Sequence, residues 1–589
     1  MDGSTPSETS SRALRGWLRN RPLPLFSIFF AAAALFAQQS QPGAQPAMPD
    51  PNNPPAPQPS PTKPEDLCGI EGQVTNVATG APVKKAELRL QRADLNPNTG
   101  SMQTSYSTTA DAAGKFAMKD IEPGKYRLSV SRNGFVNASY GARGPNRLGA
   151  TISLDAGQHL KEVNFKLTPH GVVSGRIVDE DGDPVASVSV QAQTYHRIEG
   201  RKQLVPSGFA STNDLGEYRI FGLAPGRYYL SATYSQPMWE PTQDRSAKSP
   251  PEEGYVATYY PNGIDLAAAA AVEVTPGADI RGMNIALSKT HTVRLRGHVG
   301  HPGGGKQNVM IMLTPRDEGG WFSMAGRQST DPQGNFEIRG VRPGAYTLTA
   351  QSFDGAHSTT ARLALDVGNN NMEGIALTLS PGAELPGQIK AESPQGVDLT
   401  DIHISLQPHD PSAMRISPYP GDHVKDDGTF TLTQVSQERY DVYVRGLPDG
   451  YYVKSIEAGD QEVRDAGLDM TSGPAGSLSV TIGPGAGQIE GSVQNEKQQS
   501  AAGALVVLIP DDAKRRERRD AYHTATSDQY GRFTLKGLDP GEYKLYAWDD
   551  LESGAYMDPD VMKPFESKGV TMSIHENSRE TAQLTLIPQ

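Results

Sequence analysis

The sequence predicts an all-β protein, a tandem array of five antiparallel β-sandwich domains. One motif carries the prediction: a Gly, an aromatic residue two positions later and a Tyr twelve positions after the Gly. The motif occurs five times, as Gly114/Phe116/Tyr126, Gly216/Tyr218/Tyr228, Gly334/Phe336/Tyr346, Gly428/Phe430/Tyr440 and Gly531/Phe533/Tyr543. With 61 Gly and 46 Pro among 589 residues, the composition also favours short strands and many turns.

The third copy shows why the motif predicts two strands and their turns. Asp331 and Gly334 are typical of a tight turn, after which Phe336 and Ile338 alternate with polar residues. A second turn follows at Pro343-Gly344, and the alternation then resumes in the next strand.

Each unit has an opening and a closing strand around this motif. The opening strands are centred on a Gly, at Gly72, Gly175, Gly297, Gly387 and Gly491, and alternating closing strands end near residues 169, 289, 381 and 484. About 100 residues with some seven short strands are typical of a β-sandwich. We therefore expect domains at residues 68–169, 170–289, 290–381, 382–484 and 485–589.

The N-terminal region has the pattern of an export segment. Four arginines precede an apolar run over residues 23–37, which has the length of a signal-peptide core and is short for a membrane span. Residues 1–37 are thus predicted to be a signal peptide cleaved after Ala37, or alternatively an uncleaved N-terminal membrane anchor. Residues 38–67 are rich in Pro and predict a disordered, extended linker. Both alternatives predict an extracytoplasmic location, which means secreted, periplasmic or cell-surface.

The charge argues against a nucleic-acid partner, and the cysteine content excludes an internal disulfide. The formal net charge of −12 argues against nucleic acid as a partner, because phosphate binding requires a basic surface. Cys68 is the only cysteine, so no internal disulfide can form. We expect Cys68 to be a small apolar residue at the start of a strand rather than an intermolecular crosslink.

The combined pattern Gly-x-Val, Asp-x-x-Gly-x-Phe and Pro-Gly-x-Tyr-x-Leu resembles the carboxypeptidase regulatory-like domain. The resemblance covers nearly everything from Cys68 to Gln589, and it implies a transthyretin-like (prealbumin-like) sandwich, also described as a carbohydrate-binding-like fold, without peptidase chemistry. The stretches 259–263 and Trp548-Asp549-Asp550 resemble large exported repeat proteins of soil bacteria. The fourth unit departs from the pattern, with Ser436-Gln437-Glu438-Arg439 in place of Pro-Gly, which puts its turn geometry in doubt.

No motif predicts catalysis, a metal site or a cofactor. The chain contains neither His-Glu-x-x-His nor Gly-x-Ser-x-Gly, and His291, His298 and His301 are not at ligand spacing. The acidic run 179–183 lies where a hairpin turn is needed and is too short for an EF-hand loop, so we expect a solvated turn. The basic run 514–519 is expected to be a solvated or partner-facing loop rather than a nucleic-acid site.

Aromatic residues in long loops are the candidate ligand-binding residues. Trp239, Tyr259, Tyr260 and Trp321 could stack on sugars, which present apolar C–H faces to an aromatic ring. The alternative is that these rings pack beneath their own loops as small satellite cores.

These observations predict a non-enzymatic, extracytoplasmic, multi-domain scaffold or binding protein of the cell envelope, which acts through sandwich loops and strand edges. Two alternatives stay open: a carbohydrate-binding module array, and a non-catalytic accessory of an exported hydrolase. The expected partners are a polysaccharide or an envelope protein, and membrane contact is expected only through the N-terminal segment.

Overall fold

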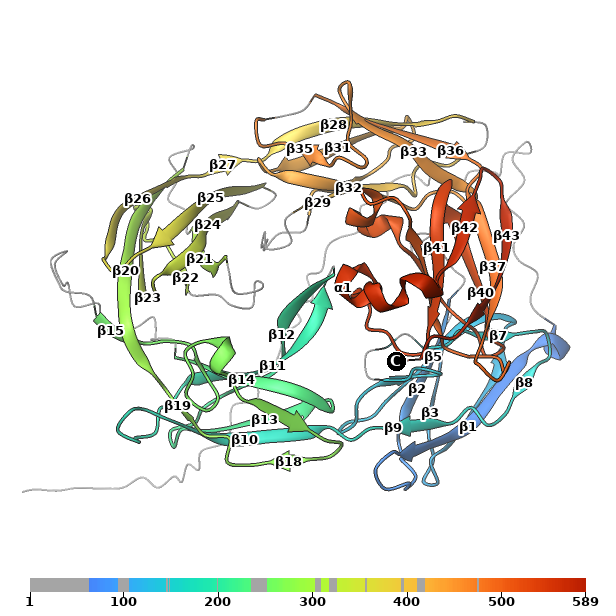
Figure 1. Ribbon diagram of the computed structural model, residues 1–589, viewed down its shortest axis with the longest axis horizontal. Helices are drawn as coiled ribbons and strands as arrows, with labels where there is room; N and C mark the ends of the chain where they lie inside the picture. Colours follow the sequence, from blue (N-terminus) through green and yellow to red (C-terminus); the bar gives the residue numbers. More distant parts are fainter. Residues whose placement is uncertain are drawn as a thin grey trace, which may run out of the picture. The chain divides into compact units, whose positions relative to one another are not determined.

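The structure is a computed structural model that describes residues 63–588 except 94–104, 145–146, 148, 199, 235–251, 302–308, 317–325, 355–356, 394–396, 410–418 and 474–475. It confirms the predicted fold class, an all-β tandem array of five sandwiches (Figure 1). The predicted signal segment and most of the predicted linker lie outside the described residues, which begin just before the short helical turn η1 (Pro64–Asp66). Within the described ranges, no helix combines the length and apolar character needed to cross a bilayer.

The first sandwich establishes the pattern that the others repeat. Its first sheet contains β1 (Cys68–Asn76), β4 (Lys115–Ile121), β8 (His159–Leu160) and β9 (Phe165–Leu167). Its second sheet contains β2 (Glu87–Arg92), β3 (Ser105–Thr109), β5 (Gly124–Ser131), β6 (Ala138–Ser139) and β7 (Ile152–Leu154). The buried cluster between the sheets runs from Cys68 to Leu167. Cys68 starts β1 with 1% of its surface exposed, which confirms its predicted role as an apolar strand residue.

The second sandwich has the same two-sheet arrangement. One sheet contains β10 (Gly171–Val178), β13 (Glu217–Leu223), β18 (Asp279–Ile280) and β19 (Ile285–Ala286). The other contains β11 (Val188–Ile198), β12 (Arg201–Ser211), β14 (Gly226–Tyr234), β16 (Thr258–Tyr259) and β17 (Ala271–Val274), with the helical turn η2 (Leu266–Ala268) between the last two. Its buried cluster runs from Val173 to Leu287.

The third sandwich takes one edge strand from the preceding segment of the chain. One sheet contains β20 (Lys289–Gly300), β23 (Asn335–Val341), β26 (Met372–Thr378) and, from the preceding segment, β15 (Glu252–Tyr255). The other contains β21 (Met310–Pro315), β22 (Gly326–Ser329), β24 (Gly344–Asp354), β25 (His357–Val367) and β27 (Ser380–Pro381). Its buried cluster runs from Val293 to Leu379.

The fourth sandwich places one more long strand in its first sheet. This sheet contains β28 (Ala383–Ala391), β31 (Thr429–Val435), β36 (Leu478–Pro484), β33 (Tyr451–Ala458) and β34 (Gln461–Glu462). The other contains β29 (His403–Pro408), β30 (Gly421–His423), β32 (Arg439–Arg445) and β35 (Leu468–Asp469). Its buried cluster runs from Leu385 to Ile482.

The fifth sandwich adds helical segments and a second small core. Its sheets contain β37 (Gly487–Gln494), β40 (Arg532–Leu538) and β43 (Arg579–Thr585), and β38 (Leu505–Pro510), β39 (His523–Thr526), β41 (Gly541–Trp548) and β42 (Val570–Ile574). The helical segments are η3 (Arg515–Glu517), η4 (Arg519–Ala521), η5 (Ala555–Met557), α1 (Pro559–Met562) and η6 (Lys563–Lys568). Trp548 is fully buried in the second cluster, stacked on Tyr546.

In one respect the sheets differ from the purely antiparallel arrangement that we expected. In every sandwich the opening strand pairs in parallel with the closing strand: β1 with β9, β10 with β19, β20 with β26, β28 with β36 and β37 with β43. The remaining pairs are antiparallel, apart from short parallel pairs such as β1 with β8. Parallel neighbours require a long connection, and here the chain passes through the second sheet before it returns.

Each opening strand carries a Gly where two groups approach its backbone closely, namely the motif aromatic ring and a carbonyl oxygen of the closing segment. In register, Gly72, Gly175, Gly297, Gly387 and Gly491 lie opposite the motif aromatics Phe116, Tyr218, Phe336, Phe430 and Phe533. A Cβ on these glycines would lie 1.9, 2.1, 2.2, 2.8 and 2.2 Å from a carbonyl oxygen of the closing segment. The opening strand therefore packs directly against the motif aromatic and the closing segment, with no room for a side chain at the Gly.

The motif Tyr fills the core and ties the turn. Its hydroxyl donates to the carbonyl oxygen four residues earlier, in Tyr126 to Glu122 (2.8 Å), Tyr228 to Ala224 (2.7 Å), Tyr440 to Ser436 (3.1 Å) and Tyr543 to Asp539 (2.8 Å). This confirms the expectation that the recurring Tyr is structural, because a buried phenol needs a hydrogen-bond partner.

The fourth turn keeps the common geometry despite its different sequence. The Tyr440 hydroxyl also accepts from the Ser436 amide at 3.0 Å, which closes the turn without Pro-Gly. Six residues before the motif Tyr, every copy has a left-handed residue opposite a register shift: Asp120, Gly222, Gly340, Gln434 and Gly537, with φ of 56, 79, 69, 61 and 69°. Gln434 therefore adopts a conformation that favours Gly.

Candidate functional site

The structure separates the four sugar-stacking candidates. Trp239 and Trp321 lie outside the described residues. Tyr259 is 8% exposed and pairs with Ser231, and Tyr260 packs against the core of the second sandwich. Tyr259 is thus buried and Tyr260 partly buried, which agrees with the alternative of satellite packing. Sugar stacking by the four residues stays a prediction.

The three histidines that we considered as metal ligands do not converge. The Nε2 atom of His291 lies 2.8 Å from the Asn369 carbonyl oxygen, and that of His298 lies 3.1 Å from the Gln333 carbonyl oxygen. Across the described ranges, no group of three or more His, Cys, Asp or Glu side chains is placed to hold a metal ion.

The acidic run forms the predicted hairpin turn. The Oδ1 atom of Asp179 accepts from the amides of Asp181 (3.0 Å) and Asp183 (2.9 Å). Glu180 forms an ion pair with Lys289. The carboxylate of Asp179 therefore stabilises the turn itself, as Asx residues commonly do.

A hollow of about 300 Å³ lies on the fourth sandwich, lined by Ile389, Lys390, Ala391, Val397, Leu399, Asp426, Asp427 and Gly428. The carboxylate of Asp427 accepts hydrogen bonds from the Thr429 hydroxyl (2.6 Å) and amide (2.9 Å). These bonds lower the pKa of Asp427, so the group is a turn cap held in its charged form. Asp427 therefore serves the turn and is not a carboxyl group tuned for proton transfer.

The basic run is partly solvated, as expected, since Lys514, Arg516 and Glu517 are exposed, but it also makes contacts within the chain. It folds as η3 and η4, and its arginines contact the same chain: Arg515 the Tyr543 hydroxyl (2.7 Å), Arg516 the Pro510 carbonyl oxygen (2.7 Å) and Arg518 the Asp465 carboxylate (2.8 Å). Arg518 is 8% exposed. The partner that this loop faces is the fourth sandwich, because Asp465 precedes β35.

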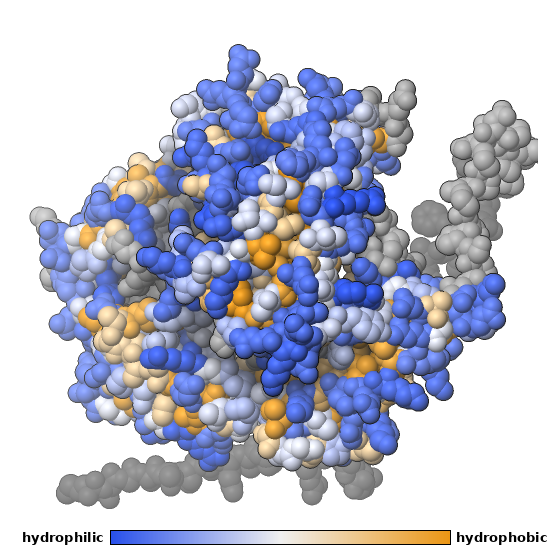
Figure 2. Space-filling model, turned by 45° about the vertical axis from the view of Figure 1, so that its right-hand side comes forward, coloured by the Kyte–Doolittle hydropathy of each residue, from blue (hydrophilic) through white to orange (hydrophobic). Residues whose placement is uncertain are grey.

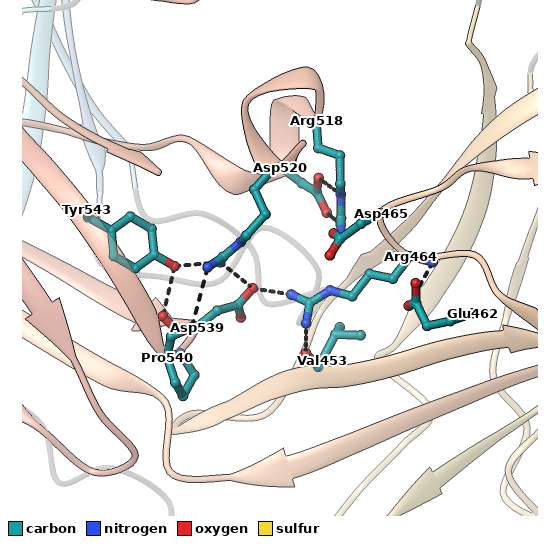
Figure 3. A network of polar contacts seen from close by, with 10 residues as sticks. Val453, Glu462, Arg464, Asp465, Arg518, Asp520, Asp539, Pro540 and Tyr543 are labelled. Carbon is teal, nitrogen blue, oxygen red and sulfur yellow. Dashed lines mark hydrogen bonds and ion pairs between the residues drawn. The ribbon is translucent and has the colours of Figure 1, made fainter. Parts of the chain in front are cut away.

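The junction between the fourth and fifth sandwiches is a dense polar network (Figure 3). Arg464, just after β34, donates to the Val453 carbonyl oxygen and forms an ion pair with Asp539 in the β40–β41 turn. The Asp539 carboxylate also lies 3.7 Å from Arg515, which donates to the motif Tyr543. The side chains of Arg464 and Asp539 are only 16% and 17% exposed. The network thus connects the inter-sandwich ion pair to the structural Tyr of the fifth unit.

A second pair reinforces this junction. Arg518 is held between Asp465 of the fourth sandwich and Asp520 of its own loop. Burial alone would lower the pKa of Arg518, but the two carboxylates outweigh it and raise the pKa, so the guanidinium stays charged. Within the described residues, the buried Nε of Arg464 and the buried Nε2 of His523 have no hydrogen-bond partner.

His523 is a histidine of this junction whose pKa is shifted. Burial lowers its pKa, and the nearby Arg515 and Arg464 act in the same direction, whereas Asp539 and Asp520 oppose the shift. The imidazole is therefore neutral near pH 7. No sequence signal indicated that this His would be buried beside charges, because its neighbours come from different strands and turns.

Contacts also connect the fifth sandwich with the first and second. The Ser153 amide donates to the Gln529 side chain at 3.0 Å, and Arg143 forms a 3.0 Å ion pair with Asp549. Arg197 forms a 3.0 Å ion pair with Asp558, next to α1. Asp549 belongs to the Trp-Asp-Asp stretch noted in the sequence, so this stretch combines a buried Trp with an ion-pairing carboxylate. The face drawn in Figure 2 is mostly hydrophilic with smaller hydrophobic areas.

One unit of the chain matches a family model. Residues 69–168 match the family model of the carboxypeptidase regulatory-like domain. A search of curated proteins found no match.

Similar solved structures include three bacterial proteins. The Bacillus anthracis TIE protein is 12% identical, with 54% of this chain and 51% of that chain covered and a TM-score of 0.16. GBS52, the minor pilin of Streptococcus agalactiae, is 16% identical, with 38% and 96% covered and a TM-score of 0.21. BcpA, the major pilin subunit of Bacillus cereus, is 11% identical, with 53% and 100% covered and a TM-score of 0.13. This chain thus spans about half the length of the first of these proteins, and TM-scores this low do not establish a shared architecture.

The family match falls on the first sandwich, whose core runs from Cys68 to Leu167. The other four sandwiches repeat the Gly, aromatic and Tyr positions of that unit, with the same cross-strand pairing. The resemblance stated from the motif is therefore confirmed, and the chain carries a carboxypeptidase regulatory-like domain match in the first of five sandwiches built on one plan.

Proposed function

We propose that this protein is a non-enzymatic, extracytoplasmic scaffold or binding protein, made of five domains with boundaries near residues 169, 289, 381 and 484. Each buried cluster lies between these positions, from Cys68–Leu167 in the first to Ile489–Leu584 in the fifth. Residues 1–37 act in this proposal as the signal peptide or anchor.

The observation that carries the proposal is that the repeated polar and aromatic groups make contacts within the chain itself. The motif tyrosines donate to carbonyl oxygens of their own turns, as in Tyr228 to Ala224 at 2.7 Å. The charged groups most suited to chemistry, Arg464, Asp539 and Arg518, hold the fourth and fifth sandwiches together. A group that is buried in such a contact is not exposed to a substrate, and removal of its partner would leave an uncompensated buried charge.

The family match also supports a non-enzymatic role. The resemblance to the regulatory-like domain implies a module without peptidase chemistry. An array that presents loops and strand edges on rigid sandwiches suits binding, since loops on a rigid scaffold commonly carry recognition. The proposed partner is another component of the cell envelope.

The test has two parts. A fusion of residues 1–67 to a reporter that is active only outside the cytoplasm should give signal, and a silent reporter would contradict the extracytoplasmic location. The purified full chain should show no turnover of peptide or polysaccharide substrates, and it should retain a defined envelope component in pull-downs from solubilised envelopes. Turnover that co-purifies with the chain, and is retained after a second purification step, would contradict the non-enzymatic proposal.

A further inference from the structure

Two histidines lie side by side on the outer face of the fourth sandwich. His403 on β29 and His423 on β30 are direct cross-strand partners. Their ring centroids are 4.9 Å apart, and the ring planes meet at 68°. Ile404 and Leu406 on the same strand are fully buried, so the alternation of β29 turns His403 away from the core. The two imidazoles are thus paired on a solvent-accessible face.

This spacing fits two imidazoles that share one metal ion. A late first-row ion lies about 2.0–2.1 Å from a ligating imidazole nitrogen, which places the ring centre about 3.2 Å from the ion. Two such rings at the 90–109° angles of square-planar or tetrahedral coordination have centres about 4.5–5.2 Å apart. The observed 4.9 Å falls within this range.

The backbone around the pair makes room for this arrangement. A Cβ at Gly421 would lie 2.8 Å from Cε1 and 3.0 Å from Nε2 of His403, so the absence of a side chain there lets the ring lie over the strand. Gly421 and Ser405 form the next cross-strand pair on the same face. Neither residue fills the space beside the two rings with a large side chain.

One neighbouring charge weakens cation binding at the pair. Arg445 pairs with His403 on the opposite side from His423, and its positive charge repels a metal ion.

We propose that His403 and His423 form a two-histidine binding site for a divalent late first-row transition ion, Zn²⁺, Ni²⁺ or Cu²⁺, with solvent completing its coordination. Imidazole nitrogen is a preferred ligand of these three ions, whereas Mg²⁺ and Ca²⁺ prefer oxygen. The site lies on the surface. A metal ion bound there could therefore be taken up from solution or could bind a partner molecule as well.

The experiment is calorimetric titration of the full chain, without an added histidine tag, with Zn²⁺ and separately with Ni²⁺. We expect one saturable site, and a loss of affinity of at least about tenfold in both His403→Ala and His423→Ala. His575→Ala is the matched control, since this exposed His of the fifth sandwich has no part in the pair, and its affinity should equal that of the wild type.

Arg445→Gln separates metal binding from a merely structural pair. Removal of the like charge should tighten binding by roughly threefold or more, and a structural role for the rings gives no reason for such a gain. Circular dichroism confirms that each variant is folded. Unchanged affinity in His423→Ala, or no saturable binding by the wild type, would overturn the proposal.

Discussion

Replacement of Gly297 by Ala tests why the opening strand of each sandwich carries a Gly. Gly297 on β20 faces Phe336 on β23 and Ile375 on β26 in register. A Cβ at this position would lie 2.2 Å from the Ile375 carbonyl oxygen and 2.5 Å from Cζ of Phe336. The ring can shift, but the carbonyl belongs to the strand that closes the sheet.

The expected loss of stability follows from the displacement of β26 that the added Cβ requires. The Cβ–oxygen contact must lengthen by about 1 Å, which costs about 1–3 kcal/mol as overpacking. Displacement of β26 also weakens its hydrogen bonds to β20, each worth about 1 kcal/mol. We expect a loss of about 3 kcal/mol in the stability of the third sandwich, which is a factor of about 150 in its opening equilibrium.

Hydrogen exchange of the full chain, followed by mass spectrometry of peptides, measures this loss domain by domain. Peptides from β20, β23 and β26 should exchange about 150-fold faster, and those of the first sandwich should be unchanged. Gly368→Ala is the matched control in the same sandwich, because a Cβ there meets no atom within 4 Å. The addition of Phe336→Leu should recover less than half of the loss, because the carbonyl contact remains.

The reasoning would be refuted if Gly297→Ala and Gly368→Ala exchanged at rates within about threefold of each other. That outcome would mean that the closing strand moves at little cost, and that the Gly is not needed for the close approach of the two strands.

Three further predictions concern the turns and the junction. Tyr228→Phe removes a hydroxyl donor to a partly buried carbonyl oxygen and should destabilise the second sandwich by about 1 kcal/mol, measured from urea unfolding followed by hydrogen exchange. A double-mutant cycle of Arg464→Met and Asp539→Asn should give a coupling free energy of about 1–2 kcal/mol, read from protection of β33 and β40, and a coupling near zero would argue against the ion pair as an inter-sandwich contact. Burial lowers the folded-state pKa of His523, so this group has no effect on stability above pH of about 6.5 and lowers stability as the pH falls below that value, because only the unfolded chain takes up the proton there. His523→Gln should flatten this acid limb of a thermal-denaturation profile, and an unchanged slope would count against the assignment.

The junction between the fourth and fifth sandwiches illustrates what could not be inferred in advance. The sequence contains 55 basic and 67 acidic residues, and no local pattern selects Asp539 as the partner of Arg464 75 positions earlier. The basic run at 514–519 was visible as a charged segment, but its intramolecular partners were not. Whether a charge is solvated or buried depends on which surfaces meet, and that is a long-range property.

The aromatic candidates show the same limit. Loop position and residue type left both sugar stacking and packing beneath the loops open for Tyr259 and Tyr260, and both side chains pack against the second sandwich. Conversely, His403 and His423 are 20 positions apart in the sequence and became neighbours only through the register of β29 and β30. A shift of one residue in that register would have turned one ring to the other face.

The sequence by itself determined the all-β class, the five repeats and the turn positions, because alternation, Asp and Gly turns and a recurring Tyr act over a few residues of chain. Only the tertiary structure decided the parallel pairing of opening with closing strands, the burial of Arg518 and the convergence of Arg464, Asp539 and Arg515. The physical reason is range: local backbone preferences are written in adjacent residues, whereas ion pairs and register depend on segments that meet after the sandwiches have formed.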